Sequence, residues 1–536
     1  MHHDITLQTD PRTAGEEKIL RKKLAEKLNL PSEKINDFRI WRKSVDARGN
    51  KVKVNLSVKV ATGDDKKVTA LHVAHEFKPV SEDAPVMMIV GAGPAGLFAA
   101  LKCIELNIKP IILERGYDVD TRRQDIANIS RQKQINPDSN YCYGEGGAGA
   151  FSDGKLFTRS KKRGNNEEVL QLLVQFGASE DILIDAHPHI GSDRLPKIIK
   201  RIREVIIENG GEVLFGKKAE RLLLKDGNAI GVVDSSGKEY YGSVMLANGH
   251  SARDFLKTLH SQGVKMEAKG LAIGVRLEHP QKLIDSIQYH QPDGRGKYLP
   301  AAEYSFVAQS NGRGVYSFCM CPGGVIVPAG SAEGELVVNG MSASARAGEF
   351  SNSGMVVELH PGDFPEYSKF KELELMHFQE DLEKKFYTLS GNSIDAPAQR
   401  MTDFVEGRIS KTLPNTSYAP GIHSADFSTL LPAFISERLR DGFITFGKKR
   451  KGFLNKEAIL VGLESRTSSP VRLPRDKESY EHIEIRNLYP VGEGAGYAGG
   501  IVSAAVDGMN AVNAFREKLR PHSIKDVKMP ERLSSS

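Results

Sequence analysis

The pattern of hydrophobic and polar positions changes several times along the chain and divides it into segments. In the first segment, leucine and isoleucine recur at helical spacing over residues 19–28, whereas apolar and polar positions alternate over residues 52–60, as in a half-buried strand. A shorter alternating run near residues 5–8 predicts another strand. Residues 1–80 therefore predict a small N-terminal α+β module of βαββ type, followed by a polar connection.

The second segment begins with five consecutive apolar residues, 86–90, which suit a strand buried on both faces. A glycine-rich turn follows at once, then an amphipathic helix, and then the apolar run 111–113. This succession is typical of a βαβ unit in a parallel sheet. Helix and strand patterns alternate again from residue 192 to Gly249, so we expect the same domain to extend that far.

The spacing of the glycines in this turn has a mechanical reason. The turn and the first helical residues are Gly91, Gly93, Pro94, Ala95 and Gly96. Gly91 permits a tight turn, Gly93 lets the backbone approach a pyrophosphate, and Gly96 lets the helix pack closely on the strand. Glu114 ends the second strand 23 residues after Gly91, close to the offset of about 20 residues expected for an acid that binds ribose hydroxyls. Together these features predict a dinucleotide site with its anion at the helix N-terminus.

The character of the chain changes again after this domain. Many β-like runs occur between residues 274 and 475, including 324–327, and a helical pattern near 368–386 interrupts them. At Leu488 the strand, glycine and helix pattern returns. The predicted fold class is therefore α/β, with a discontinuous Rossmann-like domain, an inserted β-rich α+β domain and the N-terminal module. The expected limits are 85–273 and 485–520 for the discontinuous domain, 274–484 for the insertion and 521–536 for a C-terminal tail.

Short segments at the ends of two predicted strands distinguish FAD from NAD by resemblance. Glu114 and Arg115 resemble the second-strand ending of FAD-binding proteins of the glutathione-reductase type. Asn248 and Gly249 resemble the ending Ala-Thr-Gly of a later strand in the same proteins. The resemblance implies that Glu114 holds the adenosine ribose and that Arg115 lies alongside.

A third segment resembles the terminal Gly-Asp motif of those proteins, with Gly492 and Glu493 in its place. The resemblance implies a contact between this acid and a ribityl hydroxyl. Because Glu493 is one methylene longer than Asp, we expect the contact to be displaced or made through water. Gly500 and Ile501 then open a helix whose N-terminus would face the flavin pyrimidine and stabilise its negative charge when reduced. The alternative is a glycine-rich loop before an ordinary helix.

A second glycine-rich stretch, 144–149, also has the GxGxxG spacing, but the polar residues before it cannot form the required buried strand. We interpret it as a loop that wraps the flavin, in which Gly146, Gly147 and Lys155 approach the cofactor. A plain surface loop is the alternative. No other strand–GxGxxG–helix unit appears in the sequence, so we expect no dedicated NAD(P)H domain, although NAD(P)H stays open as a transient reductant.

Several motifs taken together resemble the bacterial family of FAD-dependent dehydrogenases. They occupy residues 144–156, 247–254, 316–324, 339–346, 464–472 and 492–501. The resemblance covers nearly the whole chain. It implies non-covalent FAD, the discontinuous glutathione-reductase-type fold and a family-specific domain over the isoalloxazine. It does not supply a substrate.

Composition and charge change this picture little. The 536 residues are 40% hydrophobic and 26% charged, and four cysteines are too few for a disulfide framework. The sequence shows no signal peptide or apolar stretch of membrane-spanning length, so we expect a cytoplasmic protein without membrane insertion. The chain has a net charge of +6 and two basic clusters, 159–163 and 448–451. We interpret both clusters as solvated loops, which disfavours a nucleic-acid partner but leaves it open.

Cys319 and Cys321 are the first candidates for chemistry. On a regular strand this i, i+2 spacing separates the Cα atoms by about 6.6 Å, at the long edge of disulfide geometry. The turn that begins at residue 322 offers a way to bend the backbone, so a redox dithiol is one interpretation. Two buried, inert thiols are the favoured alternative. We expect no metal site.

Arg466 and Arg472 are the second candidates, in a loop shortly before the chain returns to the discontinuous domain. They suit a carboxylate or phosphate ligand, as does the nearby Arg475, and structural ion pairs with Glu464 or Asp476 are an equal alternative. The histidines 187, 189 and 250 are expected to be structural, and no general base is assigned.

The favoured function is an FAD-dependent oxidoreductase that transfers hydride between the flavin and an unidentified small substrate, and the arginine loop favours an anionic one. An FAD-dependent tRNA-modifying or RNA-binding flavoprotein is one alternative, suggested by the basic clusters and the N-terminal module. A non-catalytic flavin-binding or electron-carrier protein is another. The sequence predicts neither the substrate nor the oligomeric state.

Overall fold

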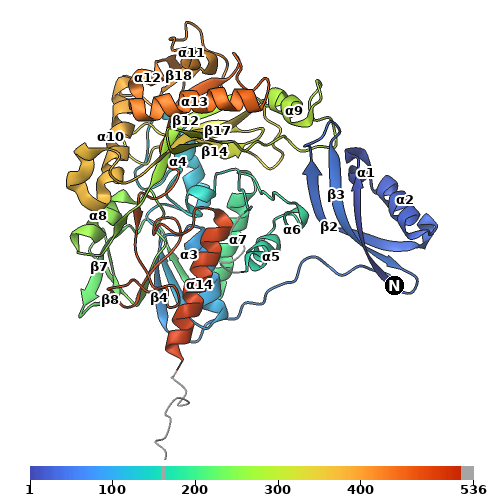
Figure 1. Cartoon of the computed structure of the whole chain (residues 1–536). Helices are drawn as coiled ribbons and strands as arrows, with labels where there is room; N and C mark the ends of the chain where they lie inside the picture. The colour runs from blue at the N-terminus through green and yellow to red at the C-terminus, as the bar shows by residue number, and fades with distance from the viewer. Residues whose placement is uncertain (158–164, 521–536) are drawn as a thin grey trace, which may run out of the picture.

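A computed structural model describes residues 1–157 and 165–520. Its central element is a parallel sheet of five strands in the order β22-β10-β4-β5-β6 (Figure 1). The strands are β4 (Val86–Val90), β5 (Lys109–Leu113), β6 (Glu212–Leu214), β10 (Ser243–Leu246) and β22 (Leu488–Pro490). If the strands are numbered in chain order from β4, the sheet read from β6 to β22 has the order 3-2-1-4-5. The order reverses between β4 and β10, as in Rossmann-type sheets. The predicted α/β class is confirmed.

Both faces of this sheet are covered. Met87 and Ile89 face one side, where α3 and α14 pack together with α7. Met88 and Val90 face the other side, where a three-stranded antiparallel sheet and α8 cover them. The alternation explains why residues 86–90 are continuously apolar. The covering elements are α3 (Pro94–Glu105), α4 (Val119–Gln132), α5 (Asn166–Gln175), α6 (Asp181–Ile184), α7 (Leu195–Glu208), β7 (Ala219–Lys225), β8 (Asn228–Asp234), β9 (Glu239–Tyr241), α8 (Arg253–Ser261) and α14 (Ile501–Leu519).

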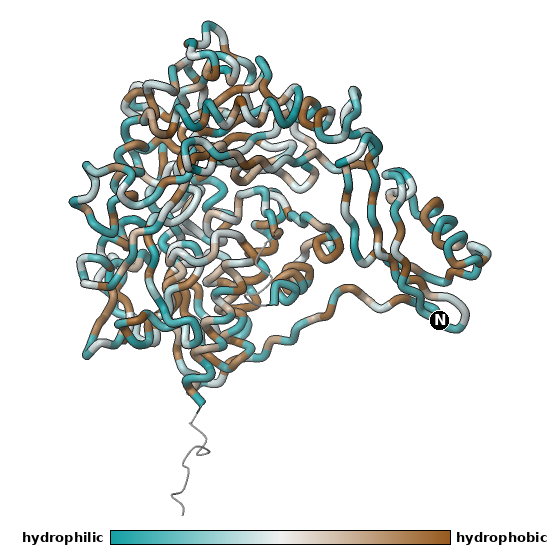
Figure 2. Tube along the Cα trace, in the orientation of Figure 1, coloured by the Kyte–Doolittle hydropathy of each residue, from teal (hydrophilic) through white to brown (hydrophobic). Residues whose placement is uncertain are grey.

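The chain between β10 and β22 forms a second, seven-stranded sheet in the order β13-β14-β17-β12-β20-β18-β19. Its strands are β12 (Leu271–Pro280), β13 (Val307–Ser310), β14 (Arg313–Cys321), β17 (Phe350–Leu359), β18 (Ala396–Arg400), β19 (Ile422–Ser424) and β20 (Ile459–Glu464). Helix α13 (Ala433–Lys449) covers one face (Figure 1), and its own Phe443 and Phe446 are fully buried against the sheet. Figure 2 shows hydrophobic residues concentrated in these strands.

Smaller elements surround the second sheet. They are α9 (Gln281–Tyr289), β15 (Val325–Pro328), β16 (Val338–Met341), α10 (Glu374–Leu389), α11 (Met401–Val405) and α12 (Phe427–Leu430). A short pair, β11 (Glu267–Ala268) and β21 (Val471–Arg472), lies where the chain enters and leaves this region.

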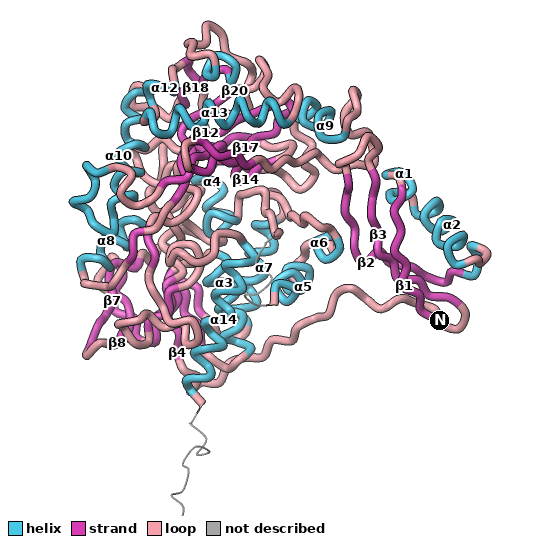
Figure 3. The backbone as a smooth tube through the Cα atoms, in the orientation of Figure 1, coloured by secondary structure: helices cyan, strands magenta, loops and turns pink. Residues whose placement is uncertain are grey.

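The N-terminal module lies to one side of the molecule, and an extended segment joins it to β4 (Figure 3). Its sheet has the order β1-β3-β2, with α2 packed on it through Leu20 and Leu24. The elements are β1 (His2–Thr9), α1 (Pro11–Gly15), α2 (Glu17–Leu28), β2 (Ile35–Asp46) and β3 (Lys53–Thr62). None of the helices in the described residues has both the length and the apolar character needed to cross a membrane.

Candidate functional site

A cavity lies between the carboxyl ends of the parallel strands and the second sheet. Residues that directly follow β4, β5, β10 and β22 line one side of it. Phe318 on β14 of the second sheet and Asn339 on β16 line the other. Open α/β sheets bind ligands at this edge, at the point where the strand order reverses. The cavity is therefore placed where the sequence predicts a dinucleotide.

The three glycines of the turn differ in what surrounds them. Gly91 has a φ of +106°, and a Cβ there would lie 2.5 Å from the carbonyl oxygen of Ala247. A Cβ on Gly96 would lie 2.0 Å from the carbonyl oxygen of Gly91. A Cβ on Gly93, however, would meet nothing nearer than an atom 4.0 Å away. Gly91 and Gly96 are thus required by the fold, whereas the space beside Gly93 belongs to the cavity.

Glu114 is 5% exposed and lines the cavity from the end of β5. Its Oε1 accepts hydrogen bonds from the backbone N–H groups of Gly116 and Gly144, both at 2.9 Å, and Oε2 accepts one from Ala92 at 2.8 Å. Because a carboxylate oxygen accepts more than one hydrogen bond, Oε2 keeps capacity for a hydroxyl group. These bonds fix the orientation of the carboxylate at the cavity wall.

Most of the residues predicted to bind the cofactor lie on the cavity wall. They are Gly91, Gly93, Pro94, Ala95, Glu114, Gly147, Lys155, Asn248, Gly249, Gly492, Glu493, Gly500 and Ile501. The other three predicted residues support the wall. Gly96 and Gly146 are packed against protein atoms, and Arg115 lies over the ring of the wall residue Tyr143.

Two features of the wall fit a flavin nucleotide. The Oδ1 atom of Asn248 is buried and has no hydrogen-bond partner, so it is free to accept one from a ligand. The backbone at Gly492 is held by a hydrogen bond of 2.8 Å from its N–H to Asp507, which in turn pairs with Arg475 at 2.6 Å. Arg475 therefore positions the Gly492–Glu493 turn rather than meeting a ligand.

Lys155 extends from the glycine-rich loop to the second sheet. Its ammonium pairs with Asp153 at 2.9 Å and donates a hydrogen bond to the backbone carbonyl of Met320. Burial opposes ionisation of Asp153, but Lys155 and Arg346 together lower its pKa to about 2. A fixed positive charge thus lies where the loop meets β14.

The two candidate arginines lie in different surroundings. Arg466 lines the cavity, but its guanidinium pairs with Glu335 at 2.6 Å and with Glu383 at 2.8 Å. Arg472 is about half exposed, pairs weakly with Glu267 at 3.9 Å and is not a wall residue. The partners of Arg466 are therefore not the Glu464 or Asp476 considered from the sequence.

Cys319 and Cys321 differ in exposure. Cys321 is buried, whereas Cys319 is exposed and lines the cavity. The expectation of two buried thiols is therefore wrong for Cys319. The reason is a break in the regular pairing of β14 between Phe318 and Cys321, which turns Cys319 out of the sheet.

Sequence reasoning missed several wall residues. His250, which was expected to be structural, lines the cavity, and its Nδ1 lies 3.3 Å from Oε2 of Glu493. Its position directly after Asn248 and Gly249, at the carboxyl end of a strand, was the available signal. Phe318 and Asn339 lie in two of the motifs that resemble the family, 316–324 and 339–346, but only the folding of β14 and β16 brings them to the cavity.

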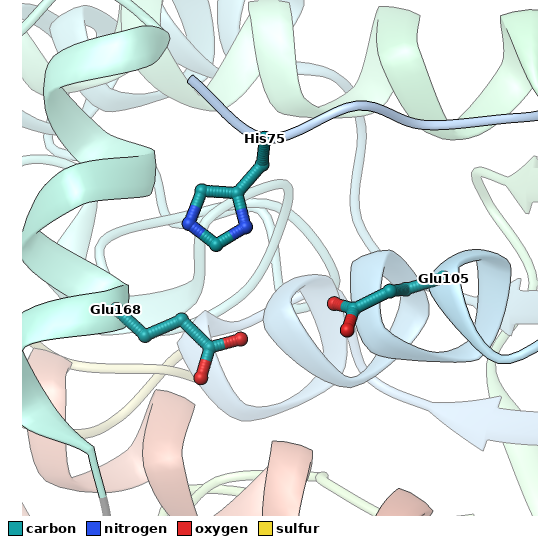
Figure 4. A group of neighbouring side chains, drawn as sticks. All are labelled: His75, Glu105 and Glu168. Atoms are coloured by element: carbon teal, nitrogen blue, oxygen red, sulfur yellow. The ribbon is translucent and has the colours of Figure 1, made fainter. Parts of the chain in front are cut away.

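Other charged groups lie away from the cavity. Among the described residues, His75, Glu105 and Glu168 form a group with metal-ligating atoms (Figure 4). The ammonium of Lys102 binds both carboxylates, at 2.8 and 2.7 Å, so it already balances their charge. The basic cluster 448–451 is exposed at the end of α13, and the cluster 159–163 and the predicted tail 521–536 lie outside the described residues.

A Rossmann-type sheet with this glycine turn, acid and cavity defines a dinucleotide-binding protein. A family model described as "FAD-dependent protein, C-terminal domain-like" matches residues 270–467, which enclose β12 to β20, and a model of a domain of unknown function matches residues 1–61. An uncharacterised protein of Clostridium beijerinckii is 42% identical over 517 residues, covering 93% of this chain and 96% of the relative. The chain belongs to the same family as this relative, a family of FAD-dependent proteins.

The solved structures show only distant similarity to this chain. CtdE in complex with FAD is 11% identical, with 81% of this chain and 84% of that chain covered and a TM-score of 0.33. The 3-ketosteroid-Δ4-(5α)-dehydrogenase of Rhodococcus jostii is 13% identical, with 82% and 99% covered and a TM-score of 0.33. TM-scores this low give no information on the substrate of this chain.

Proposed function

We propose that the protein is an oxidoreductase that binds FAD non-covalently in the cavity between the two sheets. The observation that carries the proposal is the convergence on one cavity of the Gly93 turn, the carboxylate of Glu114, the unpartnered Oδ1 of Asn248 and the Gly492–Glu493 turn. These groups come from strands far apart in sequence. Membership of an FAD-dependent family supports the same assignment.

Each group has a distinct task in this proposal. The N-terminus of α3 beside Gly93 binds the pyrophosphate, and Glu114 accepts the hydroxyls of the adenosine ribose. The N-terminus of α14, at Gly500 and Ile501, faces the flavin pyrimidine, where its partial positive charge stabilises developing negative charge. The flavin, when bound, supplies the two-electron chemistry.

His250 and Glu493 are the groups that we assign to proton handling. Hydride transfer is accompanied by movement of a proton, and imidazole is the side chain whose ordinary pKa lies nearest to neutral pH. The 3.3 Å contact between Nδ1 of His250 and the carboxylate holds the ring against the cavity wall. The ring is thereby oriented to give or take a proton at its other nitrogen.

The test is anaerobic reduction of the purified yellow protein. NADH, NADPH and a library of reduced metabolites are added separately, and the flavin absorbance is followed. The proposal predicts that at least one compound bleaches the flavin and that His250→Asn slows this reduction while the flavin stays bound. A protein whose flavin is reduced by none of these compounds would contradict an oxidoreductase role. A protein that carries no flavin would contradict the cofactor assignment itself.

A further inference from the structure

The wall of the cavity carries a thiol that the proposed function leaves unused. Cys319 lines the cavity and is exposed, and Cys321, two residues later on β14, is buried. The thiol of Cys321 lies 3.3 Å from the carbonyl oxygen of Cys319. The two cysteines therefore lie close together on one strand, with Cys319 on the cavity wall and Cys321 buried behind it.

The backbone between the two cysteines is not that of a regular strand. Phe318 pairs with Gly354 and Cys321 pairs with Asn352, so Cys319 and Met320 together face the single residue between those partners. This is a β-bulge, and Cys319 has a φ of +45°. A bulge bends the strand, which removes the obstacle that an extended i, i+2 pair presents to a disulfide.

Two cations are fixed beside the bulge. Arg276 donates a hydrogen bond of 3.1 Å from Nη1 to the carbonyl oxygen of Cys319, and Lys155 donates one to the carbonyl of Met320. Both cations are anchored, the buried Arg276 by Glu464 at 3.3 Å and the partly exposed Lys155 by Asp153 at 2.9 Å. Their charges cannot move away from the sulfur atoms.

These contacts set different protonation states for the two thiols. A hydrogen bond from Cys321 lowers the pKa of Cys319 to about 5, with Lys155 and Arg276 contributing. The pKa of Cys321 is raised by its hydrogen bond with Cys319 and by burial. At neutral pH the pair is one thiolate and one thiol, the form in which a dithiol reacts.

We propose that Cys319 and Cys321 form a redox-active dithiol that exchanges two electrons with the FAD bound in this cavity. In the oxidising direction, the thiolate of Cys319 and the thiol of Cys321 become a disulfide, and two electrons and the one proton pass to oxidised FAD. In the other direction, reduced FAD returns two electrons and one proton, and the S–S bond breaks. The inference rests on the proposed function, since it requires FAD in the cavity.

The experiment counts electrons in the air-oxidised holoprotein by anaerobic titration with dithionite. We expect the wild-type protein to take up four electrons per FAD, two for the flavin and two for the disulfide. Cys319→Ser and Cys321→Ser should each take up two, with FAD content unchanged. Cys103→Ala is the matched control, since Cys103 is buried in the core of the Rossmann-type domain, and it should still take up four.

Mass spectrometry provides the second readout. Trypsin releases residues 314–346 as one peptide that contains both cysteines, and this peptide should be lighter by two hydrogen atoms before the titration than after it. Uptake of only two electrons by the wild-type protein, or a peptide of unchanged mass, would overturn the inference. Cys142 is a cavity cysteine outside the pair, so the inference would also be overturned if Cys142→Ser took up only two electrons. A flavin-containing protein with any of these results refutes the dithiol alone, whereas a protein without flavin refutes the proposed function as well.

Discussion

Gly93 and Gly96 lie three residues apart in one turn, yet a methyl group would meet different surroundings at each. In Gly96→Ala the new Cβ would collide with the carbonyl of Gly91, and overpacking of this kind costs about 1–3 kcal/mol of unfolding free energy. In Gly93→Ala it would enter the cavity without touching protein, so the flavin-free protein should lose at most about 1 kcal/mol.

The two substitutions should therefore separate stability from cofactor binding. Gly93→Ala should weaken FAD binding by roughly tenfold or more, about 1.4 kcal/mol, because the backbone can no longer approach the pyrophosphate. Denaturant unfolding of the flavin-free proteins and FAD titration measure the two effects. Gly93→Ala protein that binds FAD as tightly as the wild type would show that the pyrophosphate lies elsewhere.

The thiol of Cys319 should show its lowered pKa as a reaction rate. Only the thiolate is alkylated, so in the reduced protein, with a pKa of about 5, the rate of iodoacetamide reaction at Cys319 should be constant from about pH 6.5 to 8.5. A small reference thiol, with an ordinary pKa of about 8.5, should instead react faster with iodoacetamide as pH rises over that range. Lys155→Met removes a nearby cation, so it should restore pH dependence at Cys319. A wild-type rate that rises tenfold per pH unit would contradict the thiolate assignment.

At the scale of elements, Glu383 on α10 joins the inserted domain to the Rossmann-type domain. Its fully buried carboxylate binds Arg253 at the start of α8, at 2.7 Å, and Arg466 after β20, at 2.8 Å. Glu383→Ala leaves both guanidinium groups without this partner, so we expect a loss of about 3–5 kcal/mol of unfolding free energy. The matched control is Lys133→Ala, which removes an exposed ion pair to Asp395 between the same two domains and should cost at most about 1 kcal/mol. Equal losses in a denaturant titration would contradict the account.

The same carboxylate should make stability sensitive to acid. Burial alone would raise the pKa of Glu383, but Arg253 and Arg466 lower it from an ordinary 4.5 to about 2. Ionised Glu383 therefore stabilises the fold fully above about pH 4.5, and this contribution declines as pH falls toward 2. The difference in unfolding free energy between wild type and Glu383→Gln should shrink over that range. A difference that is independent of pH would show that the ion pairs do not hold the pKa down.

These elements also show which features could be predicted from the sequence. The run 86–90, the glycine turn and Glu114 are local patterns, so their strand, helix and positions at the sheet edge could be predicted. The partners of Arg466 lie 83 and 131 residues away in sequence, and no spacing rule identifies them. The exposure of Cys319 depends on a bulge against a strand that begins at Phe350, so it could not be predicted either.

At the scale of the whole molecule, the N-terminal module contacts both larger domains. Lys43 pairs with Asp185 on one side, and Glu16 accepts a hydrogen bond from Tyr298 on the other. The segment that leaves the module is held by two glutamines on α5. Gln171 binds the backbone of Leu71 and Val73, and Gln175 binds both backbone groups of His75, at 2.7–3.0 Å.

Replacing both glutamines by alanine should release this segment without disturbing the cavity, because neither side chain lines it. We expect faster tryptic cleavage at Lys66 and Lys67, with FAD content unchanged. Gln124→Ala with Gln132→Ala, at exposed positions on α4, is the matched control and should leave cleavage unchanged. Cleavage at the wild-type rate in the α5 variant would show that other contacts hold the segment.

The central claim is that one FAD binds non-covalently in the cavity between the two sheets, and its most direct test is the flavin content of the purified protein. The protein is denatured by heat or acid, and the released flavin is separated and identified by chromatography. The account predicts FAD released in full, at one molecule per chain. FMN, flavin that stays attached to the denatured chain, or a protein that takes up no FAD would contradict it.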